Sequence, residues 1–336
     1  MYNNLKIKFA SAFIALLLFS GMAFAQANYK VTGKIMIGGE TRWDYLSIDK
    51  THNHLFASNN NKVQIIDLKT EKVIGEIDGQ TGVHGVEFVP ALNKGYISNR
   101  DGQITVFDLK TFKVLKSIKI EEKNPDAIMY DSYSKRIYTM NHTGKSVTAI
   151  DPVKDVPVAT VSIDGTAEAA ASDNHGRIFV NLEDKSEVCV IDTKTMKVIA
   201  NWNIKPCEAP TGMAIDLKTK RLFTVGENRM AVLDYNTGKV IATLPIGGGC
   251  DGCAFDPAAK LIFSSNGEGT MSVIKEESAD NFKPAATIET VKGARTITLD
   301  PVTHKVYSLA AFETGKTNSD GKPERIFGVL IVSPVK

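Results

Sequence analysis

The sequence predicts an all-β chain that folds as a single seven-bladed β-propeller, and three observations lead to this fold class. A short apolar string recurs at a nearly constant spacing, and each spacing holds four strand-like segments separated by turn residues. The beginning of the chain matches the fourth strand of a repeat, whereas its end stops after a third strand. A period of about 40 to 45 residues built from strands is typical of propellers.

The recurring string has five residues, and in most copies it ends in aspartate. Its copies follow one another at 41 to 43 residues until the last interval, and they lie at 63–67 (VQIID), 104–108 (ITVFD), 147–151 (VTAID), 188–192 (VCVID), 230–234 (MAVLD), 271–275 (MSVIK) and 329–333 (VLIVS). The second repeat illustrates the unit, with strands expected at 85–90, 95–99, 104–108 and 114–120 and with Gly, Asn, Asp and Lys between them. Such alternation and such turn residues indicate an antiparallel four-stranded blade.

The two ends of the chain predict how the ring closes. Residues 30–38 (KVTGKIMIG) match the fourth strands at 72–78 (KVIGEID) and 239–247 (KVIATLPIG), and the last repeat lacks a fourth strand after Ser333. The seventh blade is therefore expected to be closed by the N-terminal strand. This closure removes the free sheet edges that would favour aggregation.

Residues 1–25 have the pattern of a secretory signal peptide. Lys6 and Lys8 precede an apolar stretch from Ser11 to Phe24, and 23–25 (AFA) is a small-x-small cleavage site before Gln26. The apolar stretch is shorter than the roughly 20 residues of a membrane span, and no cysteine follows it for lipid attachment. We therefore expect a periplasmic or secreted protein, without a membrane anchor after cleavage, in which residues 26–336 form the propeller.

The charge balance gives no signal for nucleic-acid binding. Without Lys6 and Lys8 the chain has 38 basic and 38 acidic residues, whereas nucleic-acid binders usually carry a basic excess or a basic face. We expect a monomer that binds a small molecule or a protein partner.

The run from 231 to 247 (AVLDYNTGKVIATLPIG) resembles the YVTN-repeat propellers, and the chain from residue 26 onward resembles the YncE-like members of that family. This resemblance implies an exported binding protein without a generally assigned reaction. Propellers host many unrelated activities, so the resemblance is specific for fold and not for function.

Strand direction sorts the polar residues between the two faces of the ring. Loops that lead from the fourth strand to the next first strand, and from the second strand to the third, share one face, which we call the top. His84 and His142 belong to the top, whereas His52, His54, His175 and His304 fall in turns on the bottom. The His52-x-His54 pair is read as a solvated turn and not as a metal site.

The innermost strands are expected to bring several carboxylates to the mouth of the central channel. The candidate ligand-binding residues are Asp44, His84, Arg100, Asp126, His142, Glu168, Glu183, Glu227, Asp251 and Arg295. Carboxylates that converge on one aperture repel each other, so compensation is expected from a cation, from protonation or from Arg42, Arg100 and Arg295. A divalent metal with oxygen ligands or a cationic ligand would suit the mouth, although hydrated loop ends are the simpler interpretation.

The leading functional hypothesis is a binding or interaction module that holds its ligand or partner at the top face over the channel. A metal-dependent hydrolase of the lactonase kind is one alternative, and no catalytic residue is assigned for it. A redox propeller with a bound cofactor, with His84 or His142 as the ligand, is another. The cofactor is open, with a divalent cation as one candidate.

Two further features are expected on the top face. The long connection between Leu309 and Phe327 should overhang it, either as a lid or as a flexible insertion. Cys207, Cys250 and Cys253 lie in consecutive top loops, so a disulfide between Cys207 and Cys250 or Cys253 is predicted over a redox or metal pair, whereas Cys189 is expected to be buried in a strand.

Overall fold

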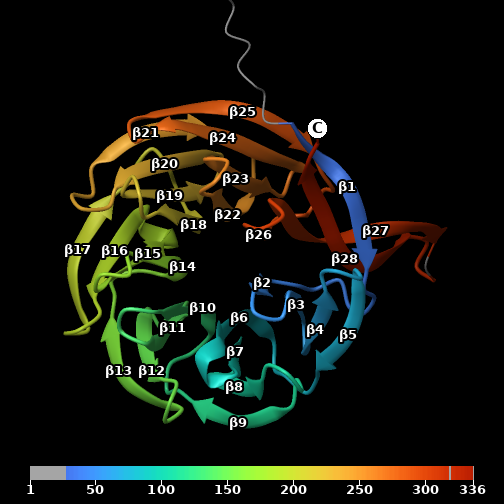
Figure 1. The fold of residues 1–336 in the computed structure, drawn as a ribbon, viewed down its shortest axis with the longest axis horizontal. Coiled ribbons are helices and arrows are strands. Elements are labelled where there is room, and N and C mark those ends of the chain that lie inside the picture. The colour runs from blue at the N-terminus through green and yellow to red at the C-terminus, as the bar shows by residue number, and fades with distance from the viewer. Residues whose placement is uncertain (1–27, 318, 336) are drawn as a thin grey trace, which may run out of the picture.

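In a computed structural model of the chain, residues 28–317 and 319–335 are described, and they form a ring of seven four-stranded antiparallel sheets (Figure 1). The predicted seven-bladed propeller is confirmed. The predicted signal peptide at 1–25 lies outside the described residues. Within the described part of the chain, no helix is both long and apolar enough to cross a membrane.

Each blade runs from an innermost strand at the channel to an outermost strand at the rim. Blade 1 comprises β2 (Leu46–Asp49), β3 (His54–Asn59), β4 (Lys62–Asp67) and β5 (Lys72–Ile77). Blade 2 comprises β6 (Val83–Val89), β7 (Lys94–Asn99), β8 (Gln103–Asp108) and β9 (Val114–Lys119). Blade 3 comprises β10 (Pro125–Asp131), β11 (Arg136–Asn141), β12 (Ser146–Asp151) and β13 (Val156–Ser162). Blade 4 comprises β14 (Ala167–Ser172), β15 (Arg177–Leu182), β16 (Glu187–Asp192) and β17 (Lys197–Asn203).

The remaining blades follow the same order. Blade 5 comprises β18 (Pro210–Asp216), β19 (Arg221–Gly226), β20 (Arg229–Asp234) and β21 (Val240–Pro245). Blade 6 comprises β22 (Cys250–Asp256), β23 (Leu261–Asn266), β24 (Thr270–Ser278) and β25 (Asn281–Glu289). Blade 7 comprises β26 (Ile297–Asp300), β27 (Lys305–Thr317), β28 (Pro323–Pro334) and, as its outer strand, β1 (Tyr29–Met36). Two single-turn 3-10 helices, η1 (Pro90–Leu92) and η2 (Glu183–Lys185), lie between strands.

The N-terminal strand closes the ring as predicted. β1 pairs antiparallel with β28, from Tyr29 opposite Pro334 to Met36 opposite Gly328. Ile35 is buried in the cluster that also holds Phe327 and Val329. The first and last described strands of the chain are therefore partners in one sheet.

The aspartate that ends most copies of the repeated string stabilises a turn. The Asp67 carboxylate accepts hydrogen bonds from the backbone N–H of Thr70 at 2.6 Å and from its hydroxyl at 2.7 Å. Asp192 accepts the equivalent pair from Thr195. Because an Asp side chain can hold a turn in this way, the motif fixes the connection between the third and fourth strands of a blade.

The core lies between neighbouring blades. Phe56 of blade 1 packs against Phe88 and Phe107 of blade 2, with ring centroids 4.9 and 5.6 Å apart. The innermost strands approach closely at Gly212, where an added Cβ would lie 2.7 Å from the backbone nitrogen of Cys253. Close packing of the blades brings their top loops together around the channel.

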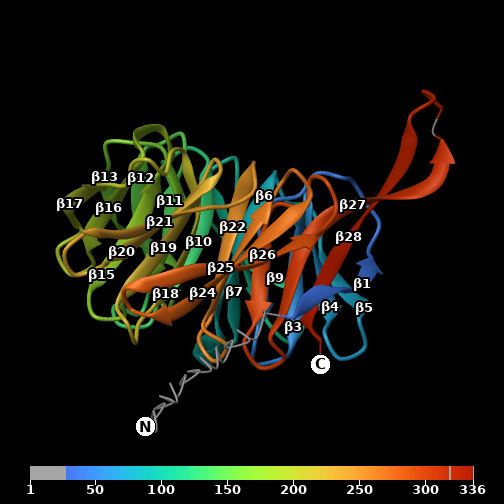
Figure 2. The ribbon, with the colours of Figure 1, turned by 90° about the horizontal axis from the view of Figure 1, so that it is seen from above.

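The long connection in blade 7 does not form a lid over the channel in the part of the chain that the structure describes. β27 and β28 continue past the ring as a two-stranded arm, in which Glu313 pairs with Arg325. The arm points outward from the rim, away from the channel mouth (Figures 1 and 2). Of the two alternatives that the sequence left open, the lid is therefore wrong, and the connection forms a projecting hairpin.

Candidate functional site

Five acidic or histidine residues reach the top mouth of the channel from the beginnings of innermost strands. Asp44 precedes β2, and the second residues of β6, β10, β14 and β22 are His84, Asp126, Glu168 and Asp251. The loops that leave β11 and β15 add His142 and Glu183. The sequence alignment of the repeats therefore predicted this convergence correctly.

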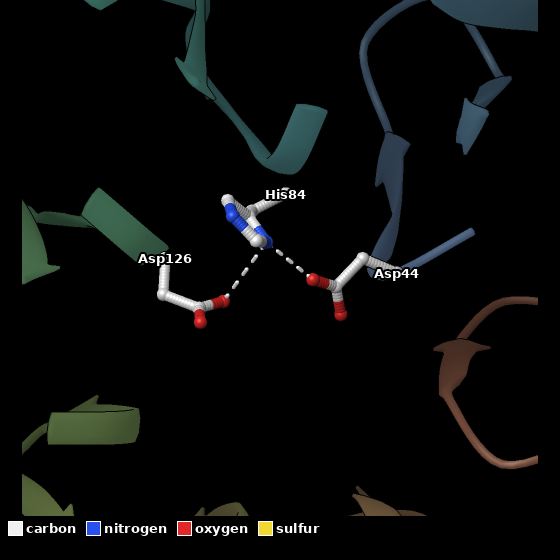
Figure 3. A group of neighbouring side chains, drawn as sticks. All are labelled: Asp44, His84 and Asp126. Carbon is white, nitrogen blue, oxygen red and sulfur yellow. Dashed lines mark hydrogen bonds and ion pairs between the residues drawn. The ribbon is translucent and has the colours of Figure 1, made fainter. Parts of the chain in front are cut away.

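His84 lies between two carboxylates (Figure 3). Its Nδ1 is 2.6 Å from Asp44 Oδ2 and 3.5 Å from Asp126 Oδ1, and its Nε2 is 3.1 Å from the Oδ1 of Asn124. Burial alone would lower the pKa of His84, but the hydrogen bond with Asp44 and the charge of Asp126 raise it above its ordinary value. Because every neighbour is an acceptor, the doubly protonated ring fits this position best.

His142 repeats the arrangement on the other side of Asp126. Its Nε2 is 3.0 Å from Glu168 Oε1 and 3.5 Å from Glu183 Oε2. The hydrogen bond with Glu168 is the main cause that raises the pKa of His142 to about 9. The other ring nitrogen, Nδ1, is buried and has no hydrogen-bond partner among the described residues.

Asp126 joins the two histidine groups. Two groups of three side chains could each hold a metal ion, because one ligand atom from each member lies within 4.8 Å of the others. The groups are Asp44, His84 and Asp126, and Asp126, His142 and Glu168. Burial, and then the nearby charge of Asp44, raise the pKa of Asp126 to about 8. We call these five residues, Asp44, His84, Asp126, His142 and Glu168, the mouth cluster.

Charge compensation at the mouth comes mainly from the histidines, not from the three arginines named in the sequence analysis. Arg295 does pair with a carboxylate, because its Nε lies 3.2 Å from Asp251 Oδ2. Burial nevertheless raises the pKa of Asp251 to about 7. Within the described chain, the side chains of Arg42 and Arg100 form no ion pair and no hydrogen bond. Glu227 is exposed and lies outside the mouth cluster.

Sequence reasoning missed two residues that contact the mouth cluster and one buried acid further down an innermost strand. The Tyr45 hydroxyl donates to Glu168 Oε2 at 3.5 Å, and Asn124 accepts from His84. Below the mouth, burial raises the pKa of Glu87 in β6 to about 7. Tyr45 follows Asp44 in the sequence, so the alignment of the innermost strands could have identified this tyrosine. No signal in the sequence marked Glu87.

Four asparagines end the second strands of blades 1, 2, 3 and 6, and they have a structural role. Asn59, Asn99, Asn141 and Asn266 are all buried. The Asn141 amide, for example, donates to Ser146 and Thr148 of the neighbouring strand at 3.0 and 2.9 Å. The side-chain amides of all four residues donate to the third strand of the same blade and thereby connect it to the second.

The predicted disulfide between Cys207 and Cys250 or Cys253 is not formed. All four cysteines carry free thiols. Cys207 instead donates through Sγ to the backbone carbonyl of Arg229 at 3.4 Å, and burial raises its pKa to about 11. Cys189 is fully buried in β16, as expected for a strand residue.

Two cavities adjoin the mouth cluster. Beneath it, the channel encloses about 180 Å³ lined by Tyr45, Met140, Met213 and other residues of the innermost strands. Beside it, an open pocket of about 460 Å³ is lined by Arg42, Trp43, Asp44, Asn60, Arg100, Arg295 and small residues. Asp44 belongs to both the mouth cluster and this second pocket.

Comparisons with known proteins identify the fold. No family model matches the chain, and no curated protein matches it. Among solved structures, hydrazine synthase from Kuenenia stuttgartiensis is similar, with 17% identity, a TM-score of 0.71 and coverage of 81% of this chain and 94% of that one.

Two further structures agree. U3-55K has 8% identity and a TM-score of 0.75 over 92% of this chain and 99% of its own, and the WD40 repeats of RRP9 have 9% identity and a TM-score of 0.73 over 91% and 98%. At these identities the likeness concerns the fold alone. The chain is a seven-bladed β-propeller with WD40-like structural neighbours.

Proposed function

We propose that this chain is a YncE-like exported binding protein that holds a divalent transition-metal ion at the mouth cluster. The observation that carries the proposal is the convergence of two imidazoles and three carboxylates from four blades, with ligand atoms within 4.8 Å in two groups that share Asp126. Ligands 2.0–2.2 Å from one ion lie up to roughly 4.2 Å apart. A small contraction of either group would therefore place three protein ligands around one ion and leave a fourth position for water or a ligand.

The donor set favours a borderline metal such as Zn²⁺ over a hard ion. The sequence alone suggested oxygen ligands, but each group contains an imidazole nitrogen. Imidazole suits Zn²⁺, Cu²⁺ and Ni²⁺, whereas Ca²⁺ and Mg²⁺ prefer oxygen ligands throughout. Binding would release the protons that His84 and His142 hold against their carboxylates, so we expect the affinity for metal to rise with pH.

The test is a titration of purified protein, treated with chelator, with Zn²⁺ by calorimetry and thermal unfolding. We expect at least one Zn²⁺ per chain, with a stabilisation of about 2.7 kcal/mol at a free concentration one hundred times Kd. The double variant H84Q/H142Q should lose this stabilisation. His304→Gln is the matched control, because His304 also pairs with an aspartate, Asp256 at 2.7 Å, but in a turn on the bottom face. Equal stabilisation of all three proteins, or of none, would overturn the proposal.

Export is the second part of the proposal, and it rests on the charged start, apolar stretch and cleavage site in residues 1–25. In the native host the protein should be recovered from the periplasm or the medium with Gln26 as its first residue. N-terminal sequencing of the fractionated protein measures this. Recovery of uncleaved chain from the cytoplasm would contradict it.

A further inference from the structure

The pocket beside the mouth cluster is unusual in its charge. Three guanidinium groups, those of Arg42, Arg100 and Arg295, line the same space of about 460 Å³. They come from two separate loops and the approach to β26, so the chain brings them together only when blades 1, 2 and 7 pack around the ring. Like charges at one pocket repel each other unless an anion lies between them.

The protein itself supplies little negative charge to balance the three arginines. Asp44 lines the pocket, but its carboxylate accepts from His84 at 2.6 Å. Arg295 is held by Asp251 at 3.2 Å. Arg42 and Arg100 line the pocket, and their side chains have neither an ion pair nor a hydrogen bond among the described residues.

The backbone leaves room for these side chains. Gly82 and Gly293 line the pocket with φ angles of +67° and +88°. Residues other than glycine rarely adopt such positive φ angles. A Cβ on Gly82 would lie 3.2 Å from Cβ of Arg100. On the inner side, Trp43 is fixed by stacking on Phe327, with ring centroids 5.7 Å apart, and it gives the pocket a flat apolar wall.

We infer that this pocket binds a small organic molecule through a compact oxyanion group, a carboxylate or a phosphate, held between Arg42, Arg100 and Arg295 and flanked by Trp43. The planar guanidinium fork matches both groups and binds them with two parallel hydrogen bonds. The volume lies within the usual range for small-molecule sites. A nucleic acid fits less well, because the chain from residue 26 onward has equal numbers of basic and acidic residues.

The anion pocket and the proposed metal site share Asp44, so the inference deepens the proposed function without depending on it. A metal bound by Asp44 would neutralise the carboxylate that lines the pocket. The pocket would then attract an anion more strongly. The ligand would then be an anionic molecule held beside a cation.

The experiment measures binding of citrate and of inorganic phosphate, separately, to chelator-treated full-length protein by calorimetry at low ionic strength. We expect at least one of the two to bind, with its affinity reduced roughly tenfold or more in R42Q/R100Q. Whichever probe binds more tightly identifies the head group. Arg136→Gln is the matched control, because this arginine begins β11 on the bottom face of blade 3, away from the pocket, and donates to the backbone carbonyl of Thr193 at 3.5 Å.

Three outcomes would overturn the inference: neither probe binds at millimolar concentration, R42Q/R100Q binds like wild type, or Arg136→Gln weakens binding equally. Unfolding curves confirm that the variants fold. Zn²⁺ titration of R42Q/R100Q separates the two proposals, because loss of anion binding with intact Zn²⁺ binding concerns this pocket alone. Conversely, anion binding by a protein that takes no Zn²⁺ supports the pocket and rejects the metal site.

Discussion

Deleting residues 29–36 should leave the protein insoluble or strongly destabilised, because β1 is the outer strand of blade 7. Its removal would expose the edge of β28 from Gly328 to Pro334, the part that now pairs with β1. Long unpaired edges favour association between chains. Solubility after expression and the midpoint of thermal unfolding measure the effect, and a deletion variant as stable as the parent would contradict this account of ring closure.

Two single substitutions in β1 test the same point more finely. Ile35 is only 6% exposed and packs into the core, whereas its neighbour Met36 is 41% exposed. Ile35→Ala should cost about 2–4 kcal/mol of unfolding free energy, as for other large-to-small core changes. Met36→Ala should change it by no more than about 0.5 kcal/mol.

The fold could be predicted from the sequence because one local pattern repeats. The aspartate at the end of most copies of the apolar string stabilises a turn within its own blade, so the spacing of these copies gives the length of a blade directly. The match between residues 30–38 and other fourth strands identified the closing partner. The arm was different, because its polar sequence between Phe312 and Ile326 shows no apolar alternation, and its strands are held by pairing with each other.

The candidate site was predictable only in part. Equivalent positions in a repeat must meet at the channel, so Asp126, Glu168 and Asp251 could be placed together from the alignment. The pairing of His84 with Asp44 joins blades 1 and 2, and it depends on side-chain directions that the repeat does not specify. The same limit explains the disulfide, because adjacent loops on one face do not ensure that their sulfur atoms come within bonding distance.

Asp126→Asn should make the empty protein more stable and abolish its stabilisation by Zn²⁺. Asp126 is buried beside Asp44, which raises its pKa from 3.8 to about 8. The wild-type protein must therefore take up a proton there on folding at neutral pH. Asn resembles the protonated carboxyl group in shape and needs no proton, so the substitution removes this cost.

The sign of the effect follows from linkage. A group whose pKa is raised in the folded state contributes stability that is complete below its unfolded pKa and is lost as the pH rises through the folded pKa. For Asp126 this loss extends from about pH 4 to about pH 8. The advantage of Asp126→Asn should therefore be near zero at pH 4 and grow to about 1–3 kcal/mol at pH 8, less than the full shift at 1.36 kcal/mol per unit because His84 and His142 respond in turn.

Denaturant unfolding at pH 4, 6 and 8, with and without Zn²⁺, measures the prediction. Asp164→Asn is the control, because Asp164 lies in a top loop with its side chain 90% exposed and should show no such pH-dependent gain. A variant that is less stable than wild type at every pH would show that Asp126 anchors the fold. A variant that is more stable than wild type, but that Zn²⁺ does not stabilise, would show that the ligand site at the channel mouth lowers the stability of the empty protein, as binding sites commonly do.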